Sequence, residues 1–112
     1  MKQQLADGTL VTEVRRLIDT AANERLGWIR ANARAAMADS QQDPVTISAL
    51  TGIAVGTVKG FLDHRDTSIK NVVLIAVALG LNTGDLERSP KEFAALLKRR
   101  RRHQPDHAGL RD

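Results

Sequence analysis

The sequence predicts an all-α protein, and three observations support this class. The chain has 112 residues, which is enough for one compact domain with appendages but too short for two domains of ordinary size. Aromatic residues make up only 3% of it, which favours helices packed through aliphatic side chains over an aromatic-rich β-sandwich. Apolar residues recur at intervals of three and four along most of the chain, as they do in amphipathic helices.

The N-terminal third contains two such apolar stripes. The first predicts a helix that starts near Gly8 and Thr9 and includes Leu10, Val14, Leu17, Ile18 and Ala21. The second stripe runs from residue 26 to about residue 38. The two belong either to one bent helix or to two helices separated within residues 23–27, and the sequence leaves this open. "DSQQDP", residues 39–44, is polar and ends in proline, which predicts a linker.

Three short helical patterns follow this linker. Thr46 is predicted to cap "ISALT", and Gly52 to end it. "VGTVKGFLDH" is predicted to form the next helix, with inward-facing Val55, Val58, Phe61 and Leu62. Ser68 is predicted to cap "IKNVVLIAVAL" and Gly80 to end it. This third helix is apolar on most sides, so we expect it to be the buried centre of the domain.

The remaining segments predict a short helix or turn and a final helix. "NTGDLER" supplies the turn, and Ser89 followed by Pro90 opens "KEFAALLKRRRR". Phe93, Leu96 and Leu97 share one side of this last helix. The net charge of +4 resides at this end, because residues 98–112 hold six basic and two acidic residues while the rest of the chain is balanced.

The segment around Gly52 has the spacing of a helix-turn-helix unit. Two helices joined by a tight turn need one residue there that adopts a left-handed backbone, and glycine does so without a Cβ clash. Ser48 is small enough to let the two helices approach. The apolar wedge between them is predicted to consist of Ile47, Ile53, Val58 and Phe61.

Residues 26–88 resemble the phage Cro and lambda-repressor (XRE-type) helix-turn-helix regulators. The resemblance is carried by "ISALTGIAVGTVKGFL" and, downstream, by "VLIAVALGLNTGDL", which looks like the fourth helix, turn and fifth helix of that family. It implies a DNA-binding domain of about five helices. An additional N-terminal helical extension would occupy residues 1–25, and a C-terminal helix with a basic tail would occupy residues 89–112.

The resemblance also implies that residues 55–62 form the recognition helix. Its base-facing positions would be Val55, Gly56, Lys59 and Gly60, with Thr57 near the backbone or a base. Only Lys59 and Thr57 can hydrogen-bond through side chains, so readout is expected to depend partly on DNA shape. Gly56 and Gly60 either permit close approach to DNA or to another helix, or are simply tolerated by packing.

Phosphate contacts are expected from two groups of residues. The first flanks the loop after the recognition helix and comprises His64, Arg65, Lys70 and Asn71. Asp63 and Asp66 would repel phosphate there unless they pair with Arg65 or Lys70. The second group, Arg99, Arg100, Arg101 and Arg102, is either a solvated helix end or an arm that holds phosphates, and the arm is favoured.

These expectations lead to a functional prediction. The protein is predicted to be a cytoplasmic, sequence-specific transcription regulator that binds double-stranded DNA as a homodimer, most simply a phage-type or prophage-type repressor acting by operator occupancy. The last helix, through Phe93, Leu96 and Leu97, is the favoured dimer contact. The alternative is an antitoxin-like or phage-coded modulator that grips another protein through its N-terminal or C-terminal helix.

Other classes of function have little support in the sequence. The chain has no cysteine, the phosphate-loop motif G-x-x-x-x-G-K-[ST] is not met, and the pair His103 and His107 is interrupted by Pro105. Neither a signal peptide nor an apolar run of membrane-spanning length is visible. We therefore expect no enzymatic activity, no cofactor and no metal.

Overall fold

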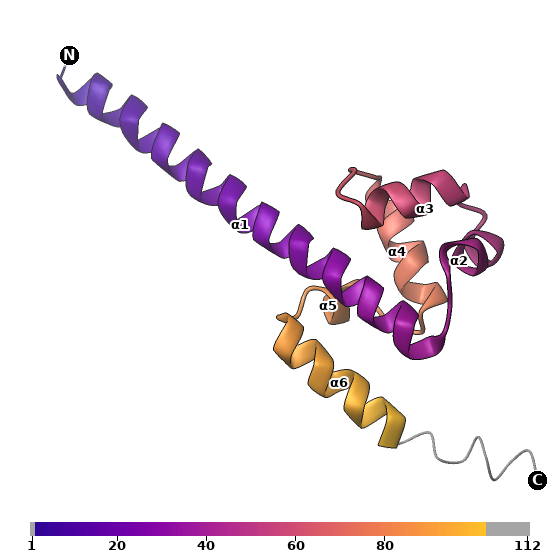
Figure 1. Ribbon diagram of the computed structural model, residues 1–112. Helices are drawn as coiled ribbons and strands as arrows, with labels where there is room; N and C mark the ends of the chain where they lie inside the picture. The colour runs from indigo at the N-terminus through magenta and orange to yellow at the C-terminus, as the bar shows by residue number, and fades with distance from the viewer. Residues whose placement is uncertain (1, 103–112) are drawn as a thin grey trace, which may run out of the picture.

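The computed structural model describes the backbone of residues 2–102 and the side chains of residues 10–102, and this part of the chain is helical without a strand (Figure 1). The all-α class is confirmed. The helices are α1 (Lys2–Ser40), α2 (Pro44–Thr51), α3 (Val55–Leu62), α4 (Ile69–Ala78), α5 (Thr83–Leu86) and α6 (Pro90–Arg102). None of these helices has the length and apolarity that a membrane span requires.

Helix α1 is one continuous helix, which answers the question that the sequence left open. Gly27 lies inside it without a kink, and no atom lies within 4 Å of the place where its Cβ would be. Figure 1 shows that the N-terminal part of α1 projects away from the other helices. Every side chain from residue 10 to residue 25, a segment that we call the rod, is exposed.

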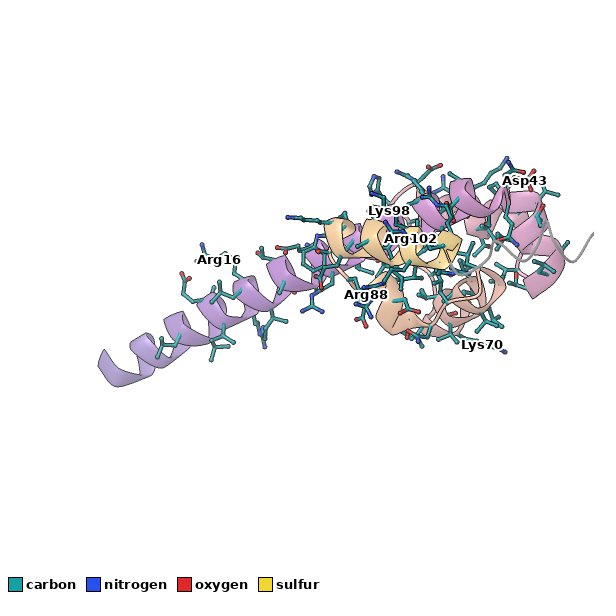
Figure 2. The ribbon with its side chains drawn as sticks, turned by 90° about the horizontal axis from the view of Figure 1, so that it is seen from below. Arg16, Asp43, Lys70, Arg88, Lys98 and Arg102 are labelled. Carbon is teal, nitrogen blue, oxygen red and sulfur yellow. The ribbon has the colours of Figure 1, made fainter. Side chains whose placement is uncertain are left out.

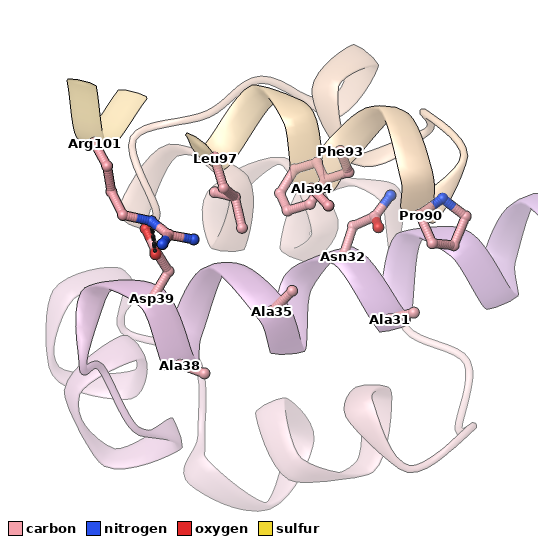
Figure 3. A pocket seen from close by; sticks show the side chains of 10 residues that line it. All are labelled: Ala31, Asn32, Ala35, Ala38, Asp39, Pro90, Phe93, Ala94, Leu97 and Arg101. Atoms are coloured by element: carbon pink, nitrogen blue, oxygen red, sulfur yellow. Dashed lines mark ion pairs between the residues drawn. The ribbon is translucent and has the colours of Figure 1, made fainter. Parts of the chain in front are cut away.

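The core lies where the C-terminal half of α1 meets the other helices. Helices α3, α5 and α6 contact α1, while α2 packs on α3 and α4, and α4 also contacts α5. Figures 1 and 3 place α6 on one side of α1 and α3 on the other. The buried apolar residues are Ala33, Ala36, Met37, Ile47, Ile53, Val58, Phe61, Leu62, Val72, Ile75, Ala76, Leu79, Leu81, Leu86, Phe93 and Leu97.

The predicted linker is shorter than expected, because α1 continues to Ser40. Gln41 then takes a left-handed conformation (φ 57°), and the N–H of Gln42 donates to the carbonyl of Met37 at 2.9 Å.

The predicted cap of α2 was wrong. Asp43 caps this helix, and Thr46 donates to the Asp43 carboxylate through its N–H and its hydroxyl, both at 2.8 Å. Pro44 takes the first helical position, where its missing N–H costs nothing. The Thr46 N–H lowers the pKa of the Asp43 carboxyl.

Helix α4 begins and ends as predicted. The Ser68 hydroxyl accepts from the N–H of Asn71 at 3.2 Å, and Gly80 (φ 74°) reverses the chain so that the N–H of Leu81 donates to Ala76 at 2.9 Å. The expectation that α4 is the buried centre of the domain holds for one face only. One face is buried, but Ile69, Val73 and Val77 are 77%, 41% and 65% exposed, because none of the described helices covers that side.

Helix α6 packs against α1 through the side that was predicted to form the dimer contact. Phe93 and Leu97 are buried in the core of their own chain, and Leu96 is half-buried. The Ser89 hydroxyl caps the helix by accepting from the N–H of Glu92 at 3.3 Å. Phe93 and Leu97 are therefore packed mainly within their own chain, and a dimer contact through this helix stays a prediction.

Candidate nucleic-acid interface

The turn between α2 and α3 has the predicted geometry. Gly52 adopts φ 79°, and its N–H donates to the carbonyl of Ser48 at 2.9 Å. The space around it is open, so the requirement for glycine comes from the left-handed backbone and not from crowding. The Thr51 hydroxyl donates to the Ile47 carbonyl at 2.7 Å and accepts from the N–H of Ile53 at 3.2 Å. The turn is thereby rigid, and in Figure 1 α2 is seen nearly end-on while α3 lies across the view.

Helix α3 buries one face and exposes the other. Val58, Phe61 and Leu62 are buried, as predicted, and Val55 is half-buried. The exposed side chains of the helix are Thr57 and Lys59, together with the backbone of Gly56. Beside them lies a shallow recess lined by Ala54, Gly56, Thr57, Gly60, Arg65 and Asp66. The recess thus brings Gly56, Thr57 and Arg65 together, whereas Lys59 is exposed on the same helix but does not line the recess.

The two glycines inside α3 have different explanations. A Cβ on Gly60 would lie 3.0 Å from Cδ of Arg65, so the Arg65 side chain crosses the helix at this position. Gly60 is therefore buried, and the expectation that it leaves backbone exposed for DNA is corrected. Gly56 has no atom within 4 Å of a Cβ position and is exposed. A Cβ at position 60 would force the Arg65 side chain to shift, whereas a Cβ at position 56 would meet no atom of the described residues.

The N-terminus of α3 differs from those of its neighbours. Ala54 precedes it and no side chain caps it. Asp43, Ser68, Asn82 and Ser89 supply side-chain caps to the other helices described after residue 43. An uncapped helix N-terminus presents N–H donors and a partial positive charge, which is the pattern that binds anions such as phosphate.

The C-terminus of α3 is anchored by two arginines of α1 that the sequence analysis missed. Arg30 is 8% exposed; its Nε donates to the Phe61 carbonyl at 2.8 Å and its Nη2 to the Arg65 carbonyl at 3.1 Å. Its guanidinium also lies over the Phe61 ring, 5.4 Å from the centroid. Arg34 donates to the Leu62 carbonyl. The available signal was a pair of arginines spaced by four residues in an alanine-rich helix.

The same arginines neutralise the acidic residues of the loop. Asp66 pairs with Arg30 at 3.4 Å and Asp63 pairs with Arg34 at 3.5 Å. The sequence-based expectation that Arg65 or Lys70 would pair with them is corrected. Lys59, Arg65 and Lys70 have no ion-pair partner within the described residues, and all three are exposed. The positive charge beside α3 therefore remains available to an anionic partner.

The loop after α3 holds the remaining predicted phosphate ligands. His64 is exposed, and its left-handed backbone (φ 80°) directs the N–H of Arg65 to the Gly60 carbonyl at 2.7 Å. Asn71 is half-buried, and its amide donates to the Thr67 hydroxyl at 2.8 Å. The Asn71 side chain is thus already engaged in a hydrogen bond, whereas the structural role of His64 comes from its backbone.

The four arginines at the end of α6 do not lie beside α3. Helix α6 is on the opposite side of α1, and Figure 2 shows Lys98 and Lys70 at opposite edges of the domain. Arg101 pairs with Asp39 at 2.7 Å, and Arg100 donates to the Leu79 carbonyl at 3.5 Å. Arg99 and Arg102 are exposed. A contact between these four residues and phosphate stays a prediction.

The strained residue in the loop gives a prediction on stability. His64→Gly is expected to raise the free energy of unfolding by about 1 kcal/mol, because a left-handed backbone disfavours any residue with a Cβ. Gly80→Ala is the matched control: at φ 74° it should lower the free energy of unfolding by about 1 kcal/mol. Urea denaturation measures both. A destabilised His64→Gly variant would contradict this explanation.

Comparison of the chain with protein-family models, with curated proteins and with solved structures found no match. Among the side chains of residues 10–102, no three His, Asp or Glu residues are placed to hold a metal ion. His103 and His107 lie outside the described residues. The candidate interface formed by α3 and the loop after it is therefore the feature from which a function can be inferred.

Proposed function

We propose that this protein is a sequence-specific DNA-binding regulator of transcription in which residues 26–88 form a lambda-repressor-like domain. The observation that carries the proposal is the surface of α3. The helix is held at its C-terminus by Arg30 and Arg34, is uncapped at its N-terminus, and exposes Gly56, Thr57 and Lys59. In its simplest form the protein is a phage-type or prophage-type repressor that occupies an operator as a homodimer.

Each exposed residue has a role in this proposal. Lys59 and Thr57 offer the side-chain hydrogen bonds for base edges, and half-buried Val55 offers an apolar contact for a thymine methyl group. Gly56 lets the DNA approach the backbone, because no side chain of the protein fills that space. Arg65, which occupies the place above Gly60, joins His64 and Lys70 in holding phosphates.

The first test is binding to DNA from upstream of the protein's own gene, beside random DNA of the same length. Lys59→Ala and Thr57→Ala are expected to reduce discrimination between the two by about 1 to 3 kcal/mol each, because a bidentate or paired base contact is worth that much. Fluorescence anisotropy measures the affinities, and Lys91→Ala, an exposed lysine on α6, is the control. Equal loss on both DNAs would show that the two side chains only anchor the backbone.

The salt dependence of binding tests the arginine run. Arg99→Ala combined with Arg102→Ala is expected to weaken binding to all DNA and to lower the slope of log affinity against log salt by up to about 2, because each phosphate contact releases about one counterion. These two arginines are chosen because Arg100 and Arg101 bond to their own chain. An unchanged slope would show that the end of α6 does not contact DNA.

A second candidate function is that of an antitoxin-like or phage-coded modulator whose main partner is a protein. The exposed apolar side chains of the rod favour it, since Leu10 and Leu17 are 61% and 68% exposed. The DNA-binding experiment separates the candidates. Absence of any sequence-selective binding, together with copurification of a stoichiometric protein partner, would favour the modulator.

A further inference from the structure

The rod of α1 has an apolar face that no other helix among the described residues covers. Leu10, Val14 and Leu17 are 61%, 51% and 68% exposed, and no side chain from residue 10 to residue 25 is buried. A helix that packs against nothing is only marginally stable in water, because most helical stability in proteins comes from burial of an apolar face. The rod is therefore a surface that another molecule is expected to cover.

The apolar face continues into the folded domain as a regular seam. Alternating steps of four and three residues along α1 give the a and d positions of four heptads, which we call the seam: Leu10, Val14, Leu17, Ala21, Glu24, Trp28, Ala31, Ala35 and Ala38. Four heptads reach the length at which such a pattern indicates a coiled coil. The outer half of the seam carries large side chains, and its inner half carries alanines that are also exposed.

The inner half of the seam forms one wall of an apolar groove. The opposite wall is α6, and the groove has a volume of about 470 Å³ (Figure 3). Its walls include Ala31, Ala35 and Ala38 from α1 and Pro90, Ala94 and Leu97 from α6. The Asp39–Arg101 ion pair lies at one end of this groove (Figure 3). The chain thus presents an apolar ridge at one end of α1 and a largely apolar groove at the other end, on the same seam.

We propose that two copies of the chain pair through α1 in an antiparallel orientation, so that the outer half of each seam fills the groove of the other copy. Residues 10 and 38 are 28 positions apart, about 42 Å at 1.5 Å per residue, and an antiparallel pair brings these two ends together. Leu10, Val14 and Leu17 then lie against the alanines, which is the large-on-small packing of a filled interface. A parallel pair would leave both grooves empty.

The charges of the rod support a second copy as the occupant. The only charged residue on the seam is Glu24, near its midpoint, and Arg25 follows it. In the antiparallel pair, Glu24 of each copy lies within about one helical turn of Arg25 of the other. Residues 10–25 hold three acidic and three basic residues, so the rod is neutral and does not favour a polyanion such as DNA or an acidic membrane.

The pairing goes beyond the proposed function and does not require it, since α3 and the seam are different surfaces.

The pairing is tested on the full chain without DNA, by measuring its molecular mass in sedimentation equilibrium at concentrations up to about 100 μM. The expected result is a dimer. Leu17→Glu and Ala35→Glu should each raise the dissociation constant at least about 100-fold, because each dimer would bury two unpaired carboxylates. Asn23→Glu, which adds the same charge at an exposed position off the seam, should change it less than about 3-fold.

Circular dichroism and thermal melting of the variants confirm that the domain folds, which is expected because residues 17 and 35 are exposed. A monomeric wild-type chain would overturn the proposal. A dimer that is equally sensitive to Asn23→Glu, or insensitive to Leu17→Glu and Ala35→Glu, would also overturn it.

Cross-linking tests whether the two α1 helices pair in an antiparallel orientation. Because the chain has no cysteine, an introduced cysteine is the only thiol that reacts. Glu24→Cys is expected to give a covalent dimer with a short bismaleimide, since the two copies of residue 24 face each other near the two-fold axis. Leu10→Cys should not, because the two copies of residue 10 lie about 42 Å apart. Efficient cross-linking through Leu10→Cys would indicate a parallel pair and would overturn the antiparallel assignment. None of these outcomes depends on whether α3 binds DNA.

Discussion

Replacing Arg30 by alanine is expected to lower the free energy of unfolding by about 3 kcal/mol. Arg30 is 8% exposed, and its guanidinium donates to the carbonyls of Phe61 and Arg65. The Phe61 carbonyl also accepts from the N–H of His64 at 3.3 Å, but that bond is longer than the one from Arg30. Hydrogen bonds to a charged donor contribute about 1.5 to 3 kcal/mol, and truncation removes this donor from both carbonyls. The guanidinium of Arg30 also lies over the Phe61 ring, so this cation–π contact is lost as well.

Urea denaturation of the full chain measures this loss, and two variants sharpen it. Arg30→Lys keeps the charge but replaces the planar guanidinium by a single ammonium group, which cannot reach both carbonyls. An intermediate loss of unfolding free energy is therefore expected. Arg16→Ala removes an exposed arginine of the rod and should change the free energy of unfolding by less than about 0.5 kcal/mol. A loss below about 1 kcal/mol for Arg30→Ala would show that water replaces the guanidinium. The end of α3 would then be held by packing alone.

Asn32→Asp is expected to be still more damaging, with a loss of about 4 kcal/mol at neutral pH. Asn32 is 2% exposed, and its amide nitrogen donates to the carbonyls of Leu86 and Arg88 at 2.8 and 2.7 Å. These bonds tie α1 to the end of α5. A carboxylate has the same shape but cannot donate, so it would face two carbonyl oxygens with a buried negative charge.

The pH dependence of this variant provides an internal check. Burial and the two carbonyls raise the pKa of the introduced carboxyl in the folded state. The loss is therefore complete above that raised pKa, becomes smaller as the pH falls from the raised pKa towards the ordinary pKa of aspartate, and is smallest below the ordinary pKa, where the carboxyl is protonated in both states. Asn23→Asp, exposed on α1, should show neither effect. A loss for Asn32→Asp that does not decrease in acid would contradict the proposed origin.

Much of the helix pattern could be predicted, because the ends of helices depend on neighbouring residues. Gly52, Ser68 and Gly80 act at the predicted positions, since each cap or reversal involves backbone groups within about five residues. The wrong cap predicted for α2 also has a local cause. Asp43 and Thr46 both suit the start of a helix, and Asp43 becomes the cap because Pro44 takes the first helical position.

The candidate site was predicted only in part. The exposure of Thr57 and Lys59 follows from the apolar spacing of α3. The burial of Gly60 does not, because it results from the Arg65 side chain folding back over the helix. Arg30 and Arg34 could not be assigned, since their partners are 28 to 36 residues away in the chain.

By itself, therefore, the sequence determined the all-α class, the order of the helices from residue 44 onward and most of their ends, because these follow from hydrogen bonds and side-chain periodicity within one or two turns. Only the tertiary structure decided that α1 is a single helix whose apolar side chains at residues 10–18 stay exposed among the described residues. It also decided that one face of α4 remains exposed and that Arg30 holds the end of α3. Which face of a helix is buried depends on contacts between segments that are distant in the sequence. When a helix is apolar on most sides, its own sequence does not show which face will be covered.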